Sequence, residues 1–248
     1  MTTSAPAAIR TEIRGRVAWI RFDGTRPFDG AFWTELAAAL DRDRDVDCVA
    51  LHGGPRFSAG NNLAWLSGAV GRATRRGGPE SALRAAGAPM RAVGRLLNDS
   101  PVVTVAVLAG EIVGAGTELA ALTDLRVAAG PVTLALPEPR LGVVPDLAPP
   151  ALLAAVLGPG LARRLLVAGE TVRLEPGHRF VDFWYDDLAR AETELGARTA
   201  DFARGPVLRA LRGATARNAA LAEAAALNAE LVGADEFRSA LGRFAEHR

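Results

Sequence analysis

Two patterns of apolar and polar positions, one typical of strands and one typical of helices, alternate along the first hundred residues of this chain. Residues 17–22 and 47–52 are short, nearly continuous apolar runs, which is typical of buried strands. Between them, apolar residues recur at helical spacing over residues 32–40. This order predicts a β-α-β unit, and therefore an α/β fold.

The same order returns after residue 100. Residues 101–108 form a further apolar run, residues 115–122 predict a short helix, and residues 125–128 and 132–136 predict two short strands. Helical patterns follow at 147–157 and 161–168, the first of which stops at Gly158-Pro159-Gly160.

The last third of the chain is almost entirely helical in pattern. After an apolar patch at 180–185, helical spacing covers residues 188–203, 206–227 and 235–247. We therefore expect a core domain over 1–185 and a C-terminal helical region over 186–248 that covers a neighbouring subunit. A plain solvated face would give the same pattern, since an amphipathic helix shows polar residues on the side away from its partner in either case.

Composition and net charge narrow the range of possible functions. Hydrophobic residues make up 49% of the 248 positions but aromatic residues only 6%, so the core must be built mainly from Ala, Val and Leu. A net charge of +1 argues against nucleic-acid binding. No lysine occurs, which excludes Schiff-base chemistry and leaves arginine to bind phosphates. No apolar stretch suits a signal peptide or a membrane span, so we expect a soluble, cytoplasmic protein.

Two glycine-containing turns are the first candidates for chemistry. Residues 57–63 follow one apolar run, and residues 110–119 leave another and enter a predicted helix, whose first N–H groups lack partners within the helix. Such N–H groups can hold a developing oxyanion. Glu118 follows the second turn directly, and Glu138 can return to it if the chain doubles back. A polarised carbonyl beside two carboxylates suggests proton transfer next to a thioester.

These residues carry a resemblance to a known family, the crotonase or enoyl-CoA hydratase/isomerase superfamily. Three ordered segments match its motifs, and the end of the chain resembles its terminal helix: Phe57-Ser58-Ala59-Gly60-Asn61-Asn62-Leu63, Gly114-Ala115-Gly116-Thr117-Glu118-Leu119-Ala120 with Asp124 and Arg126, Pro137-Glu138-Pro139-Arg140-Leu141-Gly142, and residues 234–244. Each match is weak alone, but their order and separation make a strong joint signal over nearly the whole chain.

The resemblance implies a crotonase-like spiral of β-β-α repeats in two roughly perpendicular sheets, followed by a helical C-terminal region. It further implies a homotrimer or hexamer, assembled through the trimerisation region 186–248, that acts on an acyl-CoA or carrier-protein-bound acyl thioester, with no cofactor beyond the coenzyme A of the substrate. We expect no metal, because acidic and histidine residues show no ligand spacing. The backbone N–H groups of Asn61 and Ala115 would form the oxyanion hole. Glu118 and Glu138 would be the acid/base pair of a hydratase or dehydratase.

Asp146 leaves a second activity open. It stands where certain isomerases of the family carry an aspartate, so a double-bond isomerase is the alternative. Asp146 before Leu147 is also a good N-cap for the predicted helix, worth about 1 kcal/mol, and the two roles are not exclusive.

For several other residues, a purely structural interpretation stands beside the functional one. Arg21, Arg26 and Arg56 are candidate phosphate ligands, although a solvated role is the better hypothesis for each. The only cysteine, Cys48, is expected to be a buried strand residue. Asn62 replaces the aspartate of the motif, a departure that suggests an unusual substrate.

Two further hypotheses concern the whole protein, and a third concerns one loop. A weakly active accessory protein of a biosynthetic pathway would carry the same motifs. A serine hydrolase that uses His52 near Ser58 lacks the Gly-x-Ser-x-Gly elbow. Residues 68–88, rich in glycine and arginine, predict a loop suited to a substrate lid.

Overall fold

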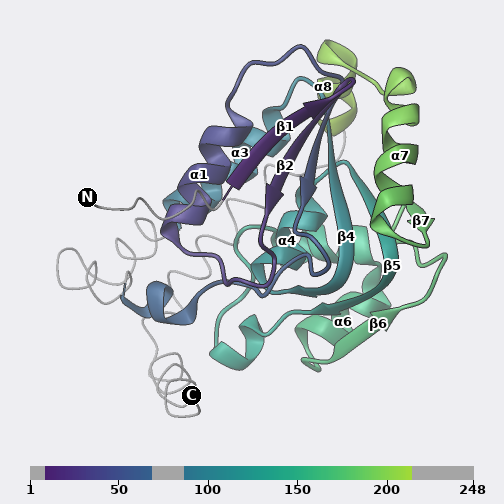
Figure 1. The fold of residues 1–248 in the computed structure, drawn as a ribbon. Helices are drawn as coiled ribbons and strands as arrows, with labels where there is room; N and C mark the ends of the chain where they lie inside the picture. Colours follow the sequence, from purple (N-terminus) through teal and green to yellow (C-terminus); the bar gives the residue numbers. More distant parts are fainter. Residues whose placement is uncertain (1–8, 69–86, 214–248) are drawn as a thin grey trace.

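A computed structural model describes residues 9–68 and 87–213, and in it one seven-stranded sheet runs in the order β1-β2-β3-β4-β5-β6, with β7 paired to β5 (Figure 1). The strands are β1 (Ile9–Arg14), β2 (Val17–Phe22), β3 (Cys48–His52), β4 (Val103–Val113), β5 (Leu125–Ala135), β6 (Thr171–Leu174) and β7 (Phe183–Tyr185). The helices are α1 (Gly30–Leu40), α3 (Ala88–Asp99), α4 (Ala115–Leu122), α5 (Pro150–Leu157), α6 (Pro159–Leu166), α7 (Leu188–Arg198) and α8 (Gly205–Gly213), with 3-10 turns at Glu138–Leu141 and Thr199–Asp201.

The central strands are covered on both faces, which explains their continuous apolar runs. Strands β2 to β5 pair in parallel, as the predicted β-α-β unit requires. Along β3, Val49 and Leu51 face the larger core with α1, α3 and α4, whereas Cys48 and Ala50 face a second core with α7. Cys48 is fully buried, as predicted, and burial raises the pKa of its thiol.

Strands β4 and β5 are longer than the sequence pattern indicated, because each passes through a glycine with positive φ. Gly110 (φ 57°) lies at a register shift in β4, and Gly130 (φ 75°) joins into one strand what was predicted as two. A Cβ on Gly110 would lie 2.5 Å from the carbonyl oxygen of Pro55, so no larger residue fits. In place of the expected pair of sheets, the described residues form one hydrogen-bonded sheet, in which β4 pairs with β3 and β5, and β5 also with β6 and β7.

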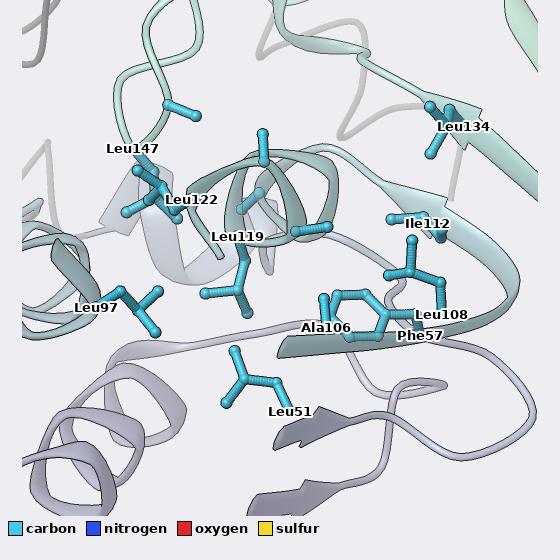
Figure 2. Packing of buried hydrophobic residues seen from close by; sticks show 14 of the residues in the cluster. Leu51, Phe57, Leu97, Ala106, Leu108, Ile112, Leu119, Leu122, Leu134 and Leu147 are labelled. Carbon is cyan, nitrogen blue, oxygen red and sulfur yellow. The ribbon is translucent and has the colours of Figure 1, made fainter. Parts of the chain in front are cut away.

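Helix α4 is buried and packs against the part of the fold that follows the register shift at Gly110 in β4. All eight of its residues are buried, and Leu119 and Leu122 pack toward Leu51, Leu97 and Leu147 (Figure 2). Around the register shift of β4, Phe57, Leu108 and Ile112 pack together (Figure 2). The N-terminus of α4 is thus held against the turn that follows β3.

Several predicted boundaries were wrong, and two strands were missed. Helix α5 begins at Pro150 rather than at residue 147, α6 spans Pro159–Leu166 rather than 161–168, and the patch at 180–185 contains strand β7. Strands β1 and β6 escaped notice because exposed polar residues outnumber or alternate with their apolar ones. The predicted lid, most of the helix over 206–227, the helix over 235–247 and the terminal motif lie outside the described residues.

Candidate active site

The turn after β3 is bound to the second half of β4, so the two glycine-containing turns lie side by side. Ser58 N–H donates to Glu111 O at 3.1 Å, and Val113 N–H donates to Ser58 O at 3.2 Å. The buried Ser58 hydroxyl accepts from Gly60 N–H at 2.8 Å and donates to Val113 O at 3.3 Å. Gly116 must be glycine here, since a Cβ would lie 2.1 Å from Ser58 Cβ.

The orientation of the Asn61 N–H follows from the peptide bond that contains it. Gly60 O accepts from Phe28 N–H at 2.8 Å, and in a trans peptide the N–H points away from the carbonyl. Asn61 N–H therefore points away from Phe28. The next peptide is fixed as well, because Asn62 N–H donates to Phe28 O at 2.7 Å.

The Ala115 N–H belongs to the first turn of α4. Gly114 O accepts from Thr117 N–H at 2.8 Å and from Glu118 N–H at 3.2 Å, so this carbonyl points into the helix and the Ala115 N–H points out of its N-terminus. The unusual backbone conformation falls on Gly114 (φ 53°, ψ −123°), which leaves alanine acceptable at 115. Within residues 9–68 and 87–213, neither the Asn61 nor the Ala115 N–H donates to a backbone carbonyl.

Glu118 is buried and held by the backbone of a distant loop. Its Oε2 accepts from Leu147 N–H and from Ala148 N–H, both at 2.8 Å. Burial raises the pKa of Glu118 well above its ordinary value, the charges of Glu138 and Asp146 raise it further, and the two N–H donors oppose them. This carboxyl is thus fixed in place but hard to ionise.

Glu138 reaches the same place from the start of the 3-10 turn after β5. A Cβ on Gly114 would lie 2.7 Å from Glu138 Oε1, so the carboxyl covers the backbone just before Ala115. Its other oxygen is buried without a hydrogen-bond partner in the part of the chain that the structure describes. Burial raises the pKa of Glu138 to about 7, with a further contribution from Asp146.

Asp146 is the third member of this acid cluster, which we define as Glu118, Glu138 and Asp146. Burial raises the pKa of Asp146, partly offset by Arg91. The N-cap hypothesis for Asp146 was wrong, because two prolines move the helix start: Pro149 is the N-cap residue of α5 and Pro150 its first residue. The charge of Asp146 raises the pKa of both glutamates, and that of Glu138 also raises the pKa of Glu118, so ionisation of all three acids at once is disfavoured.

Comparison with known proteins identifies the family. The enoyl-CoA hydratase/isomerase family model matches residues 12–178. The chain belongs to this family. A curated enoyl-CoA isomerase/hydratase of Zymoseptoria tritici is 33% identical over 112 residues, which is 45% of this chain and 36% of that protein. A mitochondrial methylglutaconyl-CoA hydratase of Pyricularia oryzae is 33% identical over 85 residues, or 34% of this chain and 24% of the relative. The matched region thus spans about a third or less of these relatives' length.

Solved structures show the same fold. The crystal structure of an enoyl-CoA hydratase from Bacillus halodurans has a TM-score of 0.79 at 19% identity, and the match covers 95% of this chain and 99% of that one. The predicted crotonase-like α/β fold is therefore confirmed. In the described residues, no helix has both the length and the apolar character needed to cross a membrane.

The other residues considered for catalysis or binding in this crotonase-family chain make contacts of their own. His52 is buried, Gly54 N–H donates to its Nδ1 at 2.8 Å, and burial lowers its pKa. Ser58 binds backbone atoms on both sides, which gives it a structural role in place of a nucleophilic one. Asn62 accepts from Trp65 N–H at 3.0 Å and so caps the short helix that begins at residue 63.

Two of the three candidate phosphate ligands are engaged in ion pairs. Arg21 binds both oxygens of Glu192 at 2.9 Å, and Arg56 binds Glu111 at 2.7 Å. Arg26 is exposed at the turn after β2.

Sequence reasoning missed the donors that hold Glu118 and the side chain that holds Asn61. The Leu147 and Ala148 donors are main-chain groups, so no residue type marks them. Trp33 Nε1–H donates to Asn61 Oδ1 at 3.0 Å, and the helical spacing of Trp33 indicated only a core residue.

Proposed function

We propose that this protein adds water to 2-enoyl thioesters of coenzyme A, or removes it from 3-hydroxyacyl thioesters. The observation that carries the proposal is the convergence of two buried carboxyls, Glu118 and Glu138, beside the N-terminus of α4. Burying several acids together is costly to a fold, and such clusters are typical of sites for proton transfer.

In this mechanism the thioester oxygen accepts hydrogen bonds from the N–H groups of Asn61 and Ala115. Their dipoles stabilise the enolate oxygen, and each donor lowers the barrier by roughly 3 kcal/mol. An ionised carboxyl takes a proton from water as its oxygen bonds to the β-carbon, and a protonated carboxyl delivers a proton to the α-carbon. Glu118 acts through Oε1, because two backbone N–H groups occupy its Oε2.

The thioester carrier is the second part of the proposal. The names of the curated relatives and of the solved structure all refer to coenzyme A esters. Arg26, exposed at the turn after β2, is the best placed of the three candidate arginines to meet a phosphate. A carrier-protein thioester would offer the same carbonyl to the same donors. A homotrimer or hexamer is the expected assembly, with the region 186–248 at the subunit contacts.

Asp146 supports one second candidate, a double-bond isomerase. Its charge acts on both Glu118 and Glu138, so a third carboxyl lies within reach of the same substrate chain. An acid farther along that chain would move a proton between distant carbons without adding water.

A panel of 2-enoyl, 3-enoyl and dienoyl CoA esters in deuterated water separates these activities. The hydratase proposal expects 3-hydroxyacyl product with deuterium at the α-carbon. Deuterium at carbon without net water addition would establish the isomerase instead. No turnover of any ester, together with weak binding, would contradict both and favour an accessory protein.

A further inference from the structure

The side chain of Asn61 is bound at both ends by buried residues of two different helices. Trp33 of α1 donates its indole N–H to Asn61 Oδ1 at 3.0 Å, and Asn61 Nδ2 lies 3.6 Å from Met90 Sδ of α3. Trp33 is fully buried and Met90 is 4% exposed. The Asn61 side chain is therefore an anchor to the core.

An aromatic cluster, which we define as Phe22, Phe28, Phe32, Trp33 and Phe57, makes this anchor rigid. Phe28 stacks on Phe32 with ring centroids 3.8 Å apart, and Trp33 meets these two rings edge-on at 5.4 and 5.2 Å. Aromatic residues are only 6% of the chain, and this group of them contacts Asn61 through the Trp33 side chain. The same cluster includes Phe28, whose backbone binds both peptides that flank Asn61.

We propose that Trp33 is a positioning residue, which aims the Asn61 N–H at the thioester oxygen. The inference rests on the proposed function, because it requires that this N–H bind the substrate carbonyl. Gly60 (φ 81°) precedes Asn61 and gives the backbone conformational freedom there. Phe28 sets the plane of the Gly60–Asn61 peptide, and Trp33 sets where Asn61 lies relative to α1. A misplacement of about 1 Å in such a group can lower the rate by about a hundredfold.

Trp33→Phe tests the bond with little loss of apolar volume. We expect kcat to fall about tenfold and KM to change less than about twofold, because the donor binds the enolate oxygen more tightly than the ground-state carbonyl. The matched control is Trp184→Phe, since Trp184 Nε1 has no hydrogen-bond partner within the described ranges. That variant should keep the kcat of the wild type.

A second readout separates positioning from stability. An aryl-enoyl CoA ester absorbs at longer wavelength when its carbonyl is polarised, so its red shift on binding to the full chain reports the oxyanion hole without turnover. We expect a red shift in the wild type, the same shift with Trp184→Phe, and a smaller shift with Trp33→Phe at saturating ester. A purely structural role of Trp33 would lower the melting temperature and leave the shift of the folded protein unchanged, which would overturn the inference.

Asn61→Ala removes the other end of the same hydrogen bond and serves where Trp33→Phe fails to fold. Its backbone N–H remains, so a reduced shift would show that the side chain positions that group. The double variant Trp33→Phe/Asn61→Ala should be no worse than Asn61→Ala alone, because both remove one interaction. Additive losses would contradict the inference. A wild type that binds the ester without any red shift would overturn the oxyanion hole itself, and this inference with it.

Discussion

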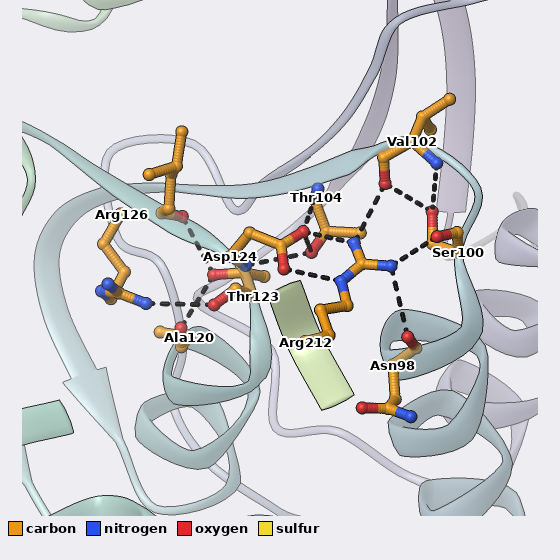
Figure 3. A network of polar contacts seen from close by, with 10 residues as sticks. Asn98, Ser100, Val102, Thr104, Ala120, Thr123, Asp124, Arg126 and Arg212 are labelled. Atoms are coloured by element: carbon orange, nitrogen blue, oxygen red, sulfur yellow. Dashed lines mark hydrogen bonds and ion pairs between the residues drawn. The ribbon is translucent and has the colours of Figure 1, made fainter. Parts of the chain in front are cut away.

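The carboxyls of the acid cluster and the carboxyl of Asp124 have opposite surroundings. Asp124 is bound by Arg212 of α8 and by Thr104, whose N–H and hydroxyl both donate to Asp124 Oδ2 at 2.8 Å (Figure 3). Arg212 also donates to the backbone carbonyls of Asn98, Ser100 and Val102. In the acid cluster, by contrast, Glu138 Oε2 has no partner among the described residues.

The pKa values follow from this difference. Burial raises the pKa of Asp124, but Arg212 and Thr104 outweigh burial and the net effect lowers it. The pKa of each member of the acid cluster is raised, mainly by burial. Other carboxyls add to this rise at Glu118 and Glu138, and Arg91 partly offsets it at Asp146. Burial alone therefore does not make an acid reactive. Asp124 joins α8 to the core through its ion pair with Arg212, whereas burial opposes ionisation in the acid cluster.

The largest effect expected from this contrast is a loss of activity without a loss of stability. Glu138→Gln keeps the shape of the side chain but cannot transfer a proton, so kcat should fall by about 10²–10⁴ in a steady-state assay with a 2-enoyl CoA ester. The midpoint of urea unfolding should stay the same or rise, because one of the repelling acids has become neutral. Glu118→Gln should behave alike. Exposed Glu175→Gln is the control, and full activity of both cluster variants would disprove the acid/base pair.

The reverse result is expected at the ion pair. Asp124→Asn removes the charge that Arg212, which is 6% exposed, binds, so the free energy of unfolding should fall by about 3–5 kcal/mol. The kcat of the folded variant should match the wild type, because the contacts described for this pair are with α8, Thr104 and backbone carbonyls at the end of α3. Asp99→Asn, an exposed acid at the end of α3, is the matched control. A strong loss of kcat at unchanged stability would mean that Asp124 is needed for catalysis and not for stability, and would contradict the comparison.

The pH dependence of stability should sharpen the contrast further. The folded-state pKa of Glu138, about 7, is above the ordinary 4.5, so the folded state binds this proton more tightly than the unfolded state does. The resulting stabilisation is fully present below about pH 4.5, declines as pH rises, and is lost above about pH 7, a difference of about 3 kcal/mol. Urea titrations at pH 5 and pH 8 should show this decline in the wild type and a smaller one in Glu138→Gln.

The contribution of Asp124 to stability should depend on pH with the opposite sign. Its pKa is lowered, so its contribution is present above about pH 4 and is lost as pH falls. Asp124→Asn should therefore leave the decline between pH 5 and pH 8 in place. Equal slopes for the wild type and Glu138→Gln would mean that Glu138 ionises normally in the folded protein.

The sequence revealed local features of this molecule better than long-range ones. The helix over 115–122 and the strand over 17–22 were predicted within their observed bounds, because their apolar spacing is strong and glycine or polar residues end them. The motifs around Asn61 and Glu118 identified the two turns. The single strand β5 was hidden because Gly130 interrupts its pattern, and Asp146 was misjudged as an N-cap because Pro149 and Pro150 restart the helix.

Contacts between distant segments left no sequence signal at all. Trp33 and Asn61 are 28 positions apart, and the Leu147 and Ala148 donors to Glu118 are main-chain groups. Arg212 pairs with an aspartate 88 positions away, and nothing in its own surroundings distinguishes it from the other arginines of the C-terminal helices. Residue patterns report faces and caps, whereas these bonds depend on how the elements pack.

The smallest expected effect separates backbone strain from displacement of an acid. Gly114→Ala would place a Cβ 2.7 Å from Glu138 Oε1, at a residue with φ 53°. Gly54→Ala has the same kind of strain (φ 83°) but meets no atom within 4 Å. Both variants should lose about 1–2 kcal/mol of unfolding free energy, since a non-glycine residue at positive φ is strained. Only Gly114→Ala should also lose kcat, by about tenfold, because Glu138 must move away from the N-terminus of α4. Equal kcat in the two variants would show that the place of Glu138 against Gly114 is unimportant for catalysis, and the acid cluster would then differ from the Asp124 pair only in charge.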